Sequence, residues 1–163
     1  MRLNFSTKMP FDKKIETHFE DKILNGTKIH TLRNDPNGRW RAGRAIQFTN
    51  GERFKPNTFK IGECISVQDV NLTFEPKHEG GIFGTLSICV DGTFLSKKDM
   101  GVFIKNDGFE QPTDFLWWFF PQGFGSVELK LINWTDKNIK FPKNIFKRKT
   151  LIINALRFFC ENK

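Results

Sequence analysis

Apolar side chains recur at every fourth position near the start of the chain and at every second position through its middle. The first spacing predicts an amphipathic helix of about four turns that begins near Pro10. Asn25-Gly26 supplies residues that commonly end a helix. The apolar positions of this predicted helix are Phe11, Ile15, Phe19 and Ile23. The chain should therefore open with a helix that buries one side.

The alternation of apolar and polar residues that follows predicts a series of short strands. Asn50-Gly51 and Asp91-Gly92 are pairs that favour tight turns between neighbouring strands. The alternation changes phase near Gln68-Asp69, which predicts a bulge or bend there. Strands joined by hairpins indicate an antiparallel or mixed barrel. The predicted strands cover residues 28–33, 45–49, 53–54, 63–74, 86–90 and 127–134.

Two short helices are predicted between the last two of these strands. Ser96, followed three residues later by Asp99, is a variant of the capping box and should begin the first helix. Asn106-Asp107-Gly108 should end it. The second helix is expected over residues 112–120, because Pro121 cannot continue a helix. Together with the strands, these helices give the α+β class, with helices over the openings of a small barrel.

Positive charge is concentrated in two segments of a chain whose formal net charge is +8. Residues 26–62 and residues 136–163 each hold eight basic and two acidic side chains. Two basic blocks favour a polyanionic partner such as RNA, although a basic surface can also serve solubility alone. We expect a domain over residues 1–135 and a basic C-terminal extension over residues 136–163. An apolar stripe from 151 to 159 predicts a helix in this extension that packs on the body, on a partner or on a membrane surface, of which the body is the favoured one.

Composition narrows the class of protein further. The sequence is 38% hydrophobic with 19 Phe, enough for its own core. It has no apolar run of about 18 residues and no apolar signal segment at its start, so we expect a cytoplasmic protein with no membrane partner. The three cysteines and three histidines are scattered without metal-ligand spacing. We therefore expect no disulfide framework, no metal and no cofactor.

Three short motifs stand at the ends of the predicted elements. Gly26-Thr-Lys28-Ile-His-Thr31-Leu-Arg33 places a Gly and then Lys-x-x-Thr-x-Arg where a helix leads into the first strand. Asp107-Gly108-Phe109 precedes the second short helix, and Ile132-Asn-Trp134-Thr135 lies on the last strand. In these motifs the chain resembles the ASCH-domain family of the PUA-like superfamily, over residues 3–135.

The resemblance implies a small PUA-like mixed β-barrel with a cleft beside the first helix that binds RNA or a modified nucleobase. One branch of the family consists of amidohydrolases that remove the acyl group from N(4)-acetylcytidine, using a Lys, a Thr and an acidic residue. Matched motif by motif, those residues are Lys28, Thr31 and Asp107 in this chain. The amidohydrolase branch has Glu where this chain has Asp107.

Elementary chemistry allows such a trio to work. A threonine hydroxyl needs a neighbouring base to become a nucleophile, and a lysine in a partly desolvated cleft can lose enough pKa to be that base. Arg33 shares the strand face of Thr31 and is suited to a phosphate or a pyrimidine carbonyl. The alternatives are structural: a solvated Lys28, a β-favouring Thr31, and an ion pair between Arg33 and Asp107. His30 lies on the opposite face, where a packed histidine is expected.

The predicted loop over residues 34–43 leads into a second candidate surface. Arg39-Trp40-Arg41-Ala-Gly-Arg44 alternates cations with an indole ring. Arginines bind phosphates and an exposed Trp stacks on bases, which suits a single-stranded nucleic acid. The alternative is that Trp40 covers the core. The sequence thus supports two functions: binding of RNA or a nucleobase through Arg33 and this loop, or hydrolysis of an acylated cytidine by Lys28, Thr31 and Asp107.

Overall fold

The computed structural model of this chain describes residues 1–52, 54–77 and 84–135. The predicted basic extension over residues 136–163, with its helix at 151–159, lies outside the described residues, as does Arg53. Within the described part of the chain, no helix has the length and apolar character that a bilayer crossing requires.

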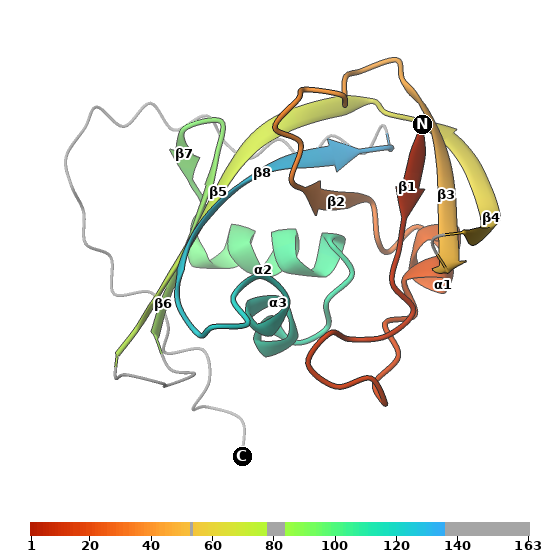
Figure 1. Cartoon of the computed structure of the whole chain (residues 1–163). Helices are drawn as coiled ribbons and strands as arrows, with labels where there is room; N and C mark the ends of the chain where they lie inside the picture. Colours follow the sequence, from red (N-terminus) through yellow and green to blue (C-terminus); the bar gives the residue numbers. More distant parts are fainter. Residues whose placement is uncertain (53, 78–83, 136–163) are drawn as a thin grey trace.

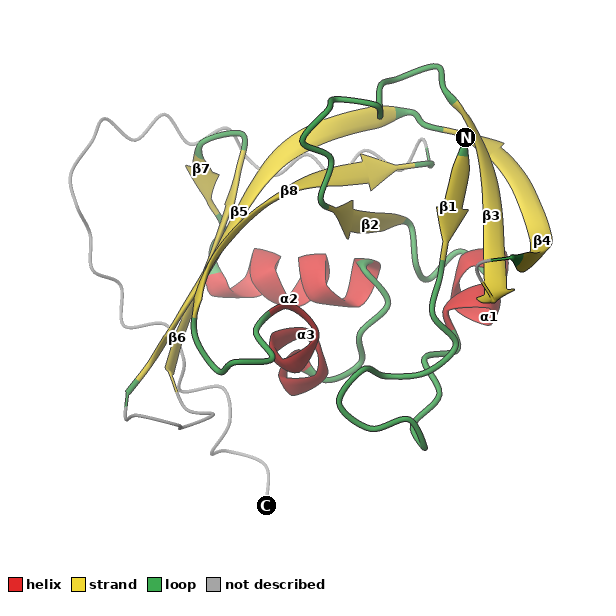
Figure 2. Cartoon of the chain, in the orientation of Figure 1, coloured by secondary structure: helices red, strands yellow, loops and turns green. Residues whose placement is uncertain are grey.

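Two β-sheets and three helices make up the described fold (Figures 1 and 2). One sheet has three strands in the order β1-β3-β4, with β1 parallel to β3. The other has five strands in the order β2-β8-β5-β6-β7, all antiparallel to their neighbours. The strands are β1 (Arg2–Asn4), β2 (His30–Arg33), β3 (Ala45–Glu52), β4 (Lys55–Glu63), β5 (Ser66–Pro76), β6 (Gly84–Val90), β7 (Thr93–Phe94) and β8 (Gly125–Asn133).

The three helices cover apolar faces of the two sheets that water would otherwise contact. α1 (Phe19–Leu24) lies beside the three-stranded sheet, and α2 (Lys97–Asn106) and α3 (Pro112–Phe119) lie under the curve of β5 and β8 (Figure 1). Ser96 caps α2 as predicted, because its side chain accepts a hydrogen bond from the Asp99 amide. The predicted α+β class is confirmed. The described strands form two sheets and no single closed barrel.

The N-terminal helix is much shorter than the apolar spacing predicted. It begins at Phe19, and residues 6–17 form a loop in which Met9 N–H donates to the Ile15 carbonyl and Thr17 N–H to the Thr7 carbonyl. Phe11 and Ile15 are 40% and 43% exposed, so the first half of the predicted apolar stripe covers no core. The prediction was wrong here because two of its four apolar residues are not buried by any tertiary contact.

The β3–β4 hairpin turns after Glu52 and not at Asn50-Gly51 as predicted. Glu52 pairs with Lys55, so Asn50 and Gly51 lie inside the ladder. The register shifts between Phe48 and Thr49, which places the bulge of this fold in the three-stranded sheet. The Asp91-Gly92 turn forms as predicted between β6 and β7.

The bulge predicted at Gln68-Asp69 is absent, since β5 pairs with β8 without a shift of register. The change of apolar phase has another cause. Val67 pairs with Ile132 and packs on the core from one side of the sheet, whereas Val70 is buried on the other side.

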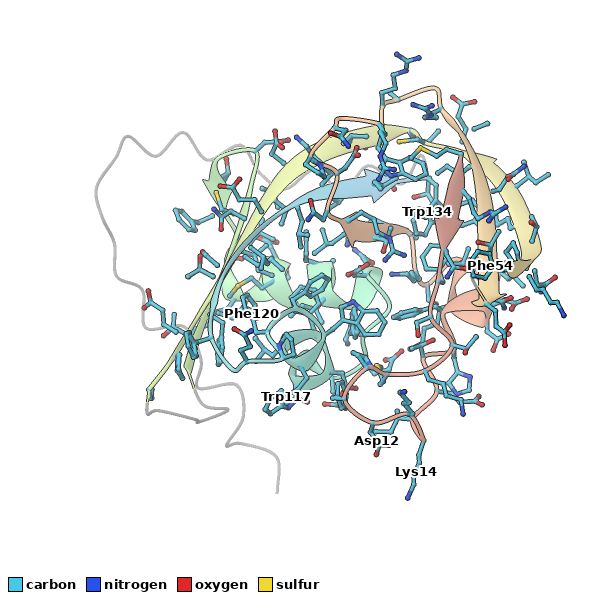
Figure 3. All side chains as sticks on the ribbon, viewed as in Figure 1. Asp12, Lys14, Phe54, Trp117, Phe120 and Trp134 are labelled. Carbon is cyan, nitrogen blue, oxygen red and sulfur yellow. The ribbon has the colours of Figure 1, made fainter. Side chains whose placement is uncertain are left out.

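Aromatic rings join the two sheets. Phe5 stacks on Phe48 at 6.1 Å between ring centroids, and Trp134 meets Phe48 edge-on at 5.1 Å. Trp134 follows β8 directly and projects beside β1 (Figure 3). Because Phe5 follows β1 and Phe48 lies on β3, these contacts hold the three-stranded sheet against the β2–β8 end of the larger sheet. The candidate site lies at this junction.

Candidate functional site

Lys28 is placed by the end of α1. The amides of Thr27 and Lys28 both donate to the Lys22 carbonyl, which turns the chain out of the helix, and Ile29 N–H donates to the Asn106 carbonyl at the end of α2. These bonds bring Lys28 against Asp107, the residue that follows α2. The sequence motif and the acidic residue predicted to accompany it therefore meet where two helices end.

The Lys28 side chain is buried with Asp107. Its Nζ lies 2.7 Å from Asp107 Oδ1 and also donates to the Asp107 main-chain oxygen. Only 1% of the Lys28 side chain and 2% of the Asp107 side chain are exposed. The alternative of a solvated Lys28 is wrong, because the pair lies beneath the surface.

Aromatic rings surround the ammonium group. Lys28 Nζ lies 4.6 Å from the ring centroid of Phe19 and 5.7 Å from that of Phe5. Gly108 lies against both the Lys28 side chain and the Phe19 ring: its φ is +91°, and a Cβ built there would lie 2.9 Å from Lys28 Cδ. Sequence reasoning missed Phe5 and Phe19 as neighbours of Lys28, since nothing in the spacing of an apolar residue indicates that it will face a buried cation.

Thr31 completes the cluster from β2. It is 4% exposed, and its hydroxyl lies near enough to the Asp107 carboxylate to lower the pKa of that group. The structure therefore brings Lys28, Thr31 and Asp107 together.

Burial shifts both members of the ion pair toward their neutral forms. Loss of solvation lowers the pKa of Lys28 from 10.5 to about 8, although the Asp107 charge and hydrogen bond oppose the shift. Loss of solvation also raises the pKa of Asp107, against the opposing effects of Lys28, Arg33 and Thr31. Both pKa shifts have the same cause: for each group, the loss of solvation outweighs the attraction between the two opposite charges.

Arg33 lies at the edge of the cluster and is half-buried. Its Nη2 donates to the Asn4 carbonyl at 2.7 Å, and its guanidinium carbon lies 5.2 Å from the Phe5 ring centroid. Burial lowers the pKa of Arg33 and the charge of Asp107 opposes this. Among the described residues, no carboxylate forms an ion pair with Arg33, so the predicted Arg33–Asp107 salt bridge is replaced by Lys28–Asp107.

His30 is a packed core residue, as its strand face predicted. Its ring lies 4.9 Å from that of Phe103, and it is 1% exposed. Desolvation, with a contribution from the charge of Lys28, lowers the pKa of His30 to about 3. Nε2 has no hydrogen-bond partner in the described part of the protein. His30 is therefore a neutral ring at neutral pH.

The loop that follows β2 is organised by Asp35. Asp35 Oδ2 accepts from the Trp40 amide at 2.8 Å and Oδ1 accepts from Arg39 Nε at 3.1 Å, while Arg44 donates to the Arg39 carbonyl. Trp40 is 6% exposed and belongs to the core. The prediction that Trp40 stacks on a base is wrong, and the alternative that it covers the core is confirmed.

The three arginines of this loop remain at or near the surface. Arg39 and Arg41 are exposed and Arg44 is half-buried. None of them contacts Lys28, Thr31 or Asp107 among the hydrogen bonds and ion pairs of the described residues. The structure thus presents two separate features: a buried cluster with Arg33 at its edge, and a basic loop.

No group of three or more potential metal ligands occurs among the described residues. No family model, no curated protein and no solved structure matches this chain. The argument for function therefore rests on the residues and their geometry.

Proposed function

We propose that this protein is an ASCH-like, PUA-like domain that binds RNA or a modified nucleobase beside the Lys28-x-x-Thr31-x-Arg33 motif. The observation that carries the proposal is the state of Arg33. The residue is half-buried, its guanidinium lies on an aromatic ring and donates to one main-chain carbonyl, and no carboxylate forms an ion pair with it among the described residues. A partly desolvated cation with free donors favours a phosphate or carbonyl oxygen.

The charge balance of the cluster supports the same proposal. Lys28 and Arg33 bring two positive charges and Asp107 brings one negative charge, which Lys28 engages directly. The excess positive charge lies at the Arg33 edge. Because Lys28 and Asp107 are buried, the ligand of this proposal contacts Arg33, and the buried pair serves to hold β2 in place.

The basic loop extends the proposed surface along a strand of nucleic acid. Arg39, Arg41 and Arg44 lie within six consecutive positions of the loop between β2 and β3, and the hydrogen bonds to Asp35 fix the loop backbone. Arginines on an ordered loop contact successive phosphates at little cost in conformational entropy. With Trp40 in the core, these contacts are electrostatic and independent of base identity.

Fluorescence anisotropy with a labelled single-stranded RNA across salt concentrations tests the binding proposal. Each phosphate contact adds about −0.7 to the slope of log K against log salt. Replacing Arg39, Arg41 and Arg44 together by Ala should flatten the slope by about two units, and Arg33→Gln should weaken binding about tenfold. Lys98→Gln, which removes an exposed positive charge at the far end of α2, is the matched control. Wild-type protein that binds no RNA and no nucleoside overturns the proposal.

A second candidate function is hydrolysis of an acylated cytidine. Two observations favour it: the pKa of Lys28 is lowered to about 8, and the Thr31 hydroxyl lies near enough to the Asp107 carboxylate to lower the pKa of that group. In this alternative Asp107 accepts the Thr31 proton and Lys28 holds the carboxylate in place. Thr31 is 4% exposed, so the acyl carbon reaches it only when the cover moves. That requirement is why binding is the first proposal.

A further inference from the structure

Asp35 is an acidic side chain buried at the start of the basic loop between β2 and β3. It stands two residues after Arg33, where β2 ends, and only 1% of its side chain is exposed. The sequence motifs do not include it. A carboxylate repels phosphates, so an acid at this place either weakens the proposed RNA surface or supports the loop that carries the arginines.

Both carboxylate oxygens of Asp35 are used within the loop. Oδ2 accepts from the Trp40 amide at 2.8 Å, and Oδ1 accepts from Arg39 Nε at 3.1 Å. The Asp35 main-chain oxygen accepts from the Gly38 amide at 3.1 Å. Burial acts to raise the pKa of Asp35, but its contacts with Trp40 and Arg39 outweigh burial and hold the pKa below its usual value. The carboxylate is therefore charged, and it faces the protein.

The bond to the Trp40 amide fixes which side chains of the loop face outward. Trp40 is 6% exposed and packs in the core, whereas its neighbours Arg39 and Arg41 are exposed. The Trp40 residue is thus held at two points, its amide on Asp35 and its indole in the core. The Arg41 guanidinium forms no hydrogen bond and no ion pair within the described part of the chain, so its five N–H donors are free for a ligand.

The far end of the loop is fixed by different bonds. The Gly43 amide donates to the Cys64 carbonyl, and the Cys64 amide donates to the Arg44 carbonyl, both at 2.8 Å. Arg44 also donates from its guanidinium to the Arg39 carbonyl. Among the described residues, Asp35 is the one carboxylate that accepts hydrogen bonds from this loop. The segment between β2 and Gly43 therefore depends on Asp35 for its conformation.

We infer that Asp35 is a positioning residue of the proposed RNA surface, which holds Arg39 and Arg41 outward on a loop that is ordered before the ligand binds. An acidic side chain thus raises the affinity for an anion. Ordering the loop in advance lowers the conformational entropy that is lost on binding. This inference rests on the binding function proposed above.

Asp35→Asn tests the inference, because charge and positioning have opposite effects on binding. The variant removes one negative charge and nearly keeps the shape of the side chain. A residue that acts through its charge alone would tighten RNA binding when neutralised, whereas loss of a positioning residue weakens it. We expect affinity for a labelled single-stranded RNA, followed by fluorescence anisotropy, to fall about tenfold. Glu128→Gln removes an exposed charge on β8 and is the matched control, which should bind at least as tightly as wild type.

The salt dependence of binding shows whether Asp35 acts through the arginines. Arg41→Ala alone should flatten the slope of log K against log salt by about 0.7, and Asp35→Asn should flatten it in the same direction although it removes no positive charge. In a protein that already carries Arg39→Ala, Arg41→Ala and Arg44→Ala, Asp35→Asn should cause no further loss of affinity. An equal loss in that background would show that Asp35 acts through folding and would overturn the inference.

The remaining outcomes separate the inference from the function on which it rests. Melting temperatures are recorded for every variant, and the titrations are run below the lowest of them. If Asp35→Asn binds RNA as tightly as wild type or more tightly, the inference is overturned and the proposed function stands. If Arg41→Ala keeps the wild-type affinity and slope, the loop does not present this residue to RNA and the inference is also overturned. If the wild-type protein binds no RNA, the proposed RNA surface and the inference fall together.

Discussion

Lys28 and Asp107 form an ion pair, 2.7 Å from Nζ to Oδ1, at a depth where 1% and 2% of their side chains remain exposed. They are separated by most of the domain in sequence, and α1 and α2 bring them together by ending at the same point. The pair ties the Lys-x-x-Thr-x-Arg strand to the helical layer. It contributes to folding whatever ligand the protein binds.

Removing either partner of this pair should destabilise the protein strongly. Lys28→Met and Asp107→Asn each leave a buried polar group without its partner, which costs about 3–5 kcal/mol of unfolding free energy. The double variant Lys28→Met/Asp107→Leu should recover much of that loss, because it buries no unpaired charge. Urea unfolding measures all three. Lys22→Met is the control, since Lys22 pairs with the exposed Glu110 and should cost less; equal losses in Lys28→Met and Lys22→Met would contradict a special role for the buried pair.

Gly108 should tolerate no side chain. Gly108→Ala places a Cβ 2.9 Å from Lys28 Cδ and 3.1 Å from the Phe19 ring, at a φ of +91° that disfavours Ala. We expect a loss of more than about 1 kcal/mol in unfolding free energy. Gly101→Ala is the matched control, because a Cβ on that α2 residue meets nothing within 4 Å and a helix gains up to about 1 kcal/mol from the change. Equal melting temperatures for the two variants would show that the turn relaxes freely.

His30 should make the protein less stable in acid. The folded-state pKa is lowered to about 3 from 6.5, so between these values the unfolded chain binds a proton that the native chain does not. The contribution of neutral His30 to the unfolding free energy is therefore complete above pH 6.5. It falls as the pH drops, by about 2 kcal/mol between pH 7 and pH 5. Urea titrations at the two pH values should show this loss in wild type and not in His30→Leu. His18→Gln, at an exposed histidine, should behave as wild type, and identical pH dependence in all three would refute the assignment.

The amidohydrolase alternative predicts a defined pH dependence. With the pKa of Lys28 lowered to about 8, hydrolysis of N(4)-acetylcytidine should fall most steeply between pH 7 and pH 9, because the neutral amine no longer holds the Asp107 carboxylate in place. Thr31→Ser should keep part of the rate and Thr31→Val should have none, as followed by chromatography of released cytidine. If N(4)-acetylcytidine stays intact through a long incubation with the protein, this function is eliminated. If Thr31→Val hydrolyses the substrate as fast as wild type, the nucleophile is a water molecule beside Asp107 and not Thr31.

Local sequence signals located most of the elements of this fold. Ser96 with Asp99, the Asp91-Gly92 turn, and the alternation through Leu86, Ile88 and Val90 each involve neighbours within a few residues, and the structure confirms all three. A helix cap or a turn depends on short-range hydrogen bonds. A strand face depends on which alternate residues are apolar. The sequence carries that information directly.

The failures share one physical cause, which is that burial is decided by distant segments. Phe11 and Phe19 fit the same helical spacing, yet only Phe19 finds a core to cover. Trp40 fits an exposed stacking role in its basic loop, yet hydrogen bonds to Asp35 fold the loop and the core covers the ring. Periodicity states which residues share a face and does not state what packs on that face.

The sequence alone determined that Lys28, Thr31 and Asp107 belong together, through their motifs, and that Arg33 shares the face of Thr31. Only the tertiary structure decided that the ammonium and the carboxylate lie buried against Phe5 and Phe19, with Arg33 left at the edge beside Asn4. The reason is that solvation of a charge depends on every segment that packs around it. Phe5, Phe19 and Asn4 reach the site from parts of the chain that no local pattern connects to it.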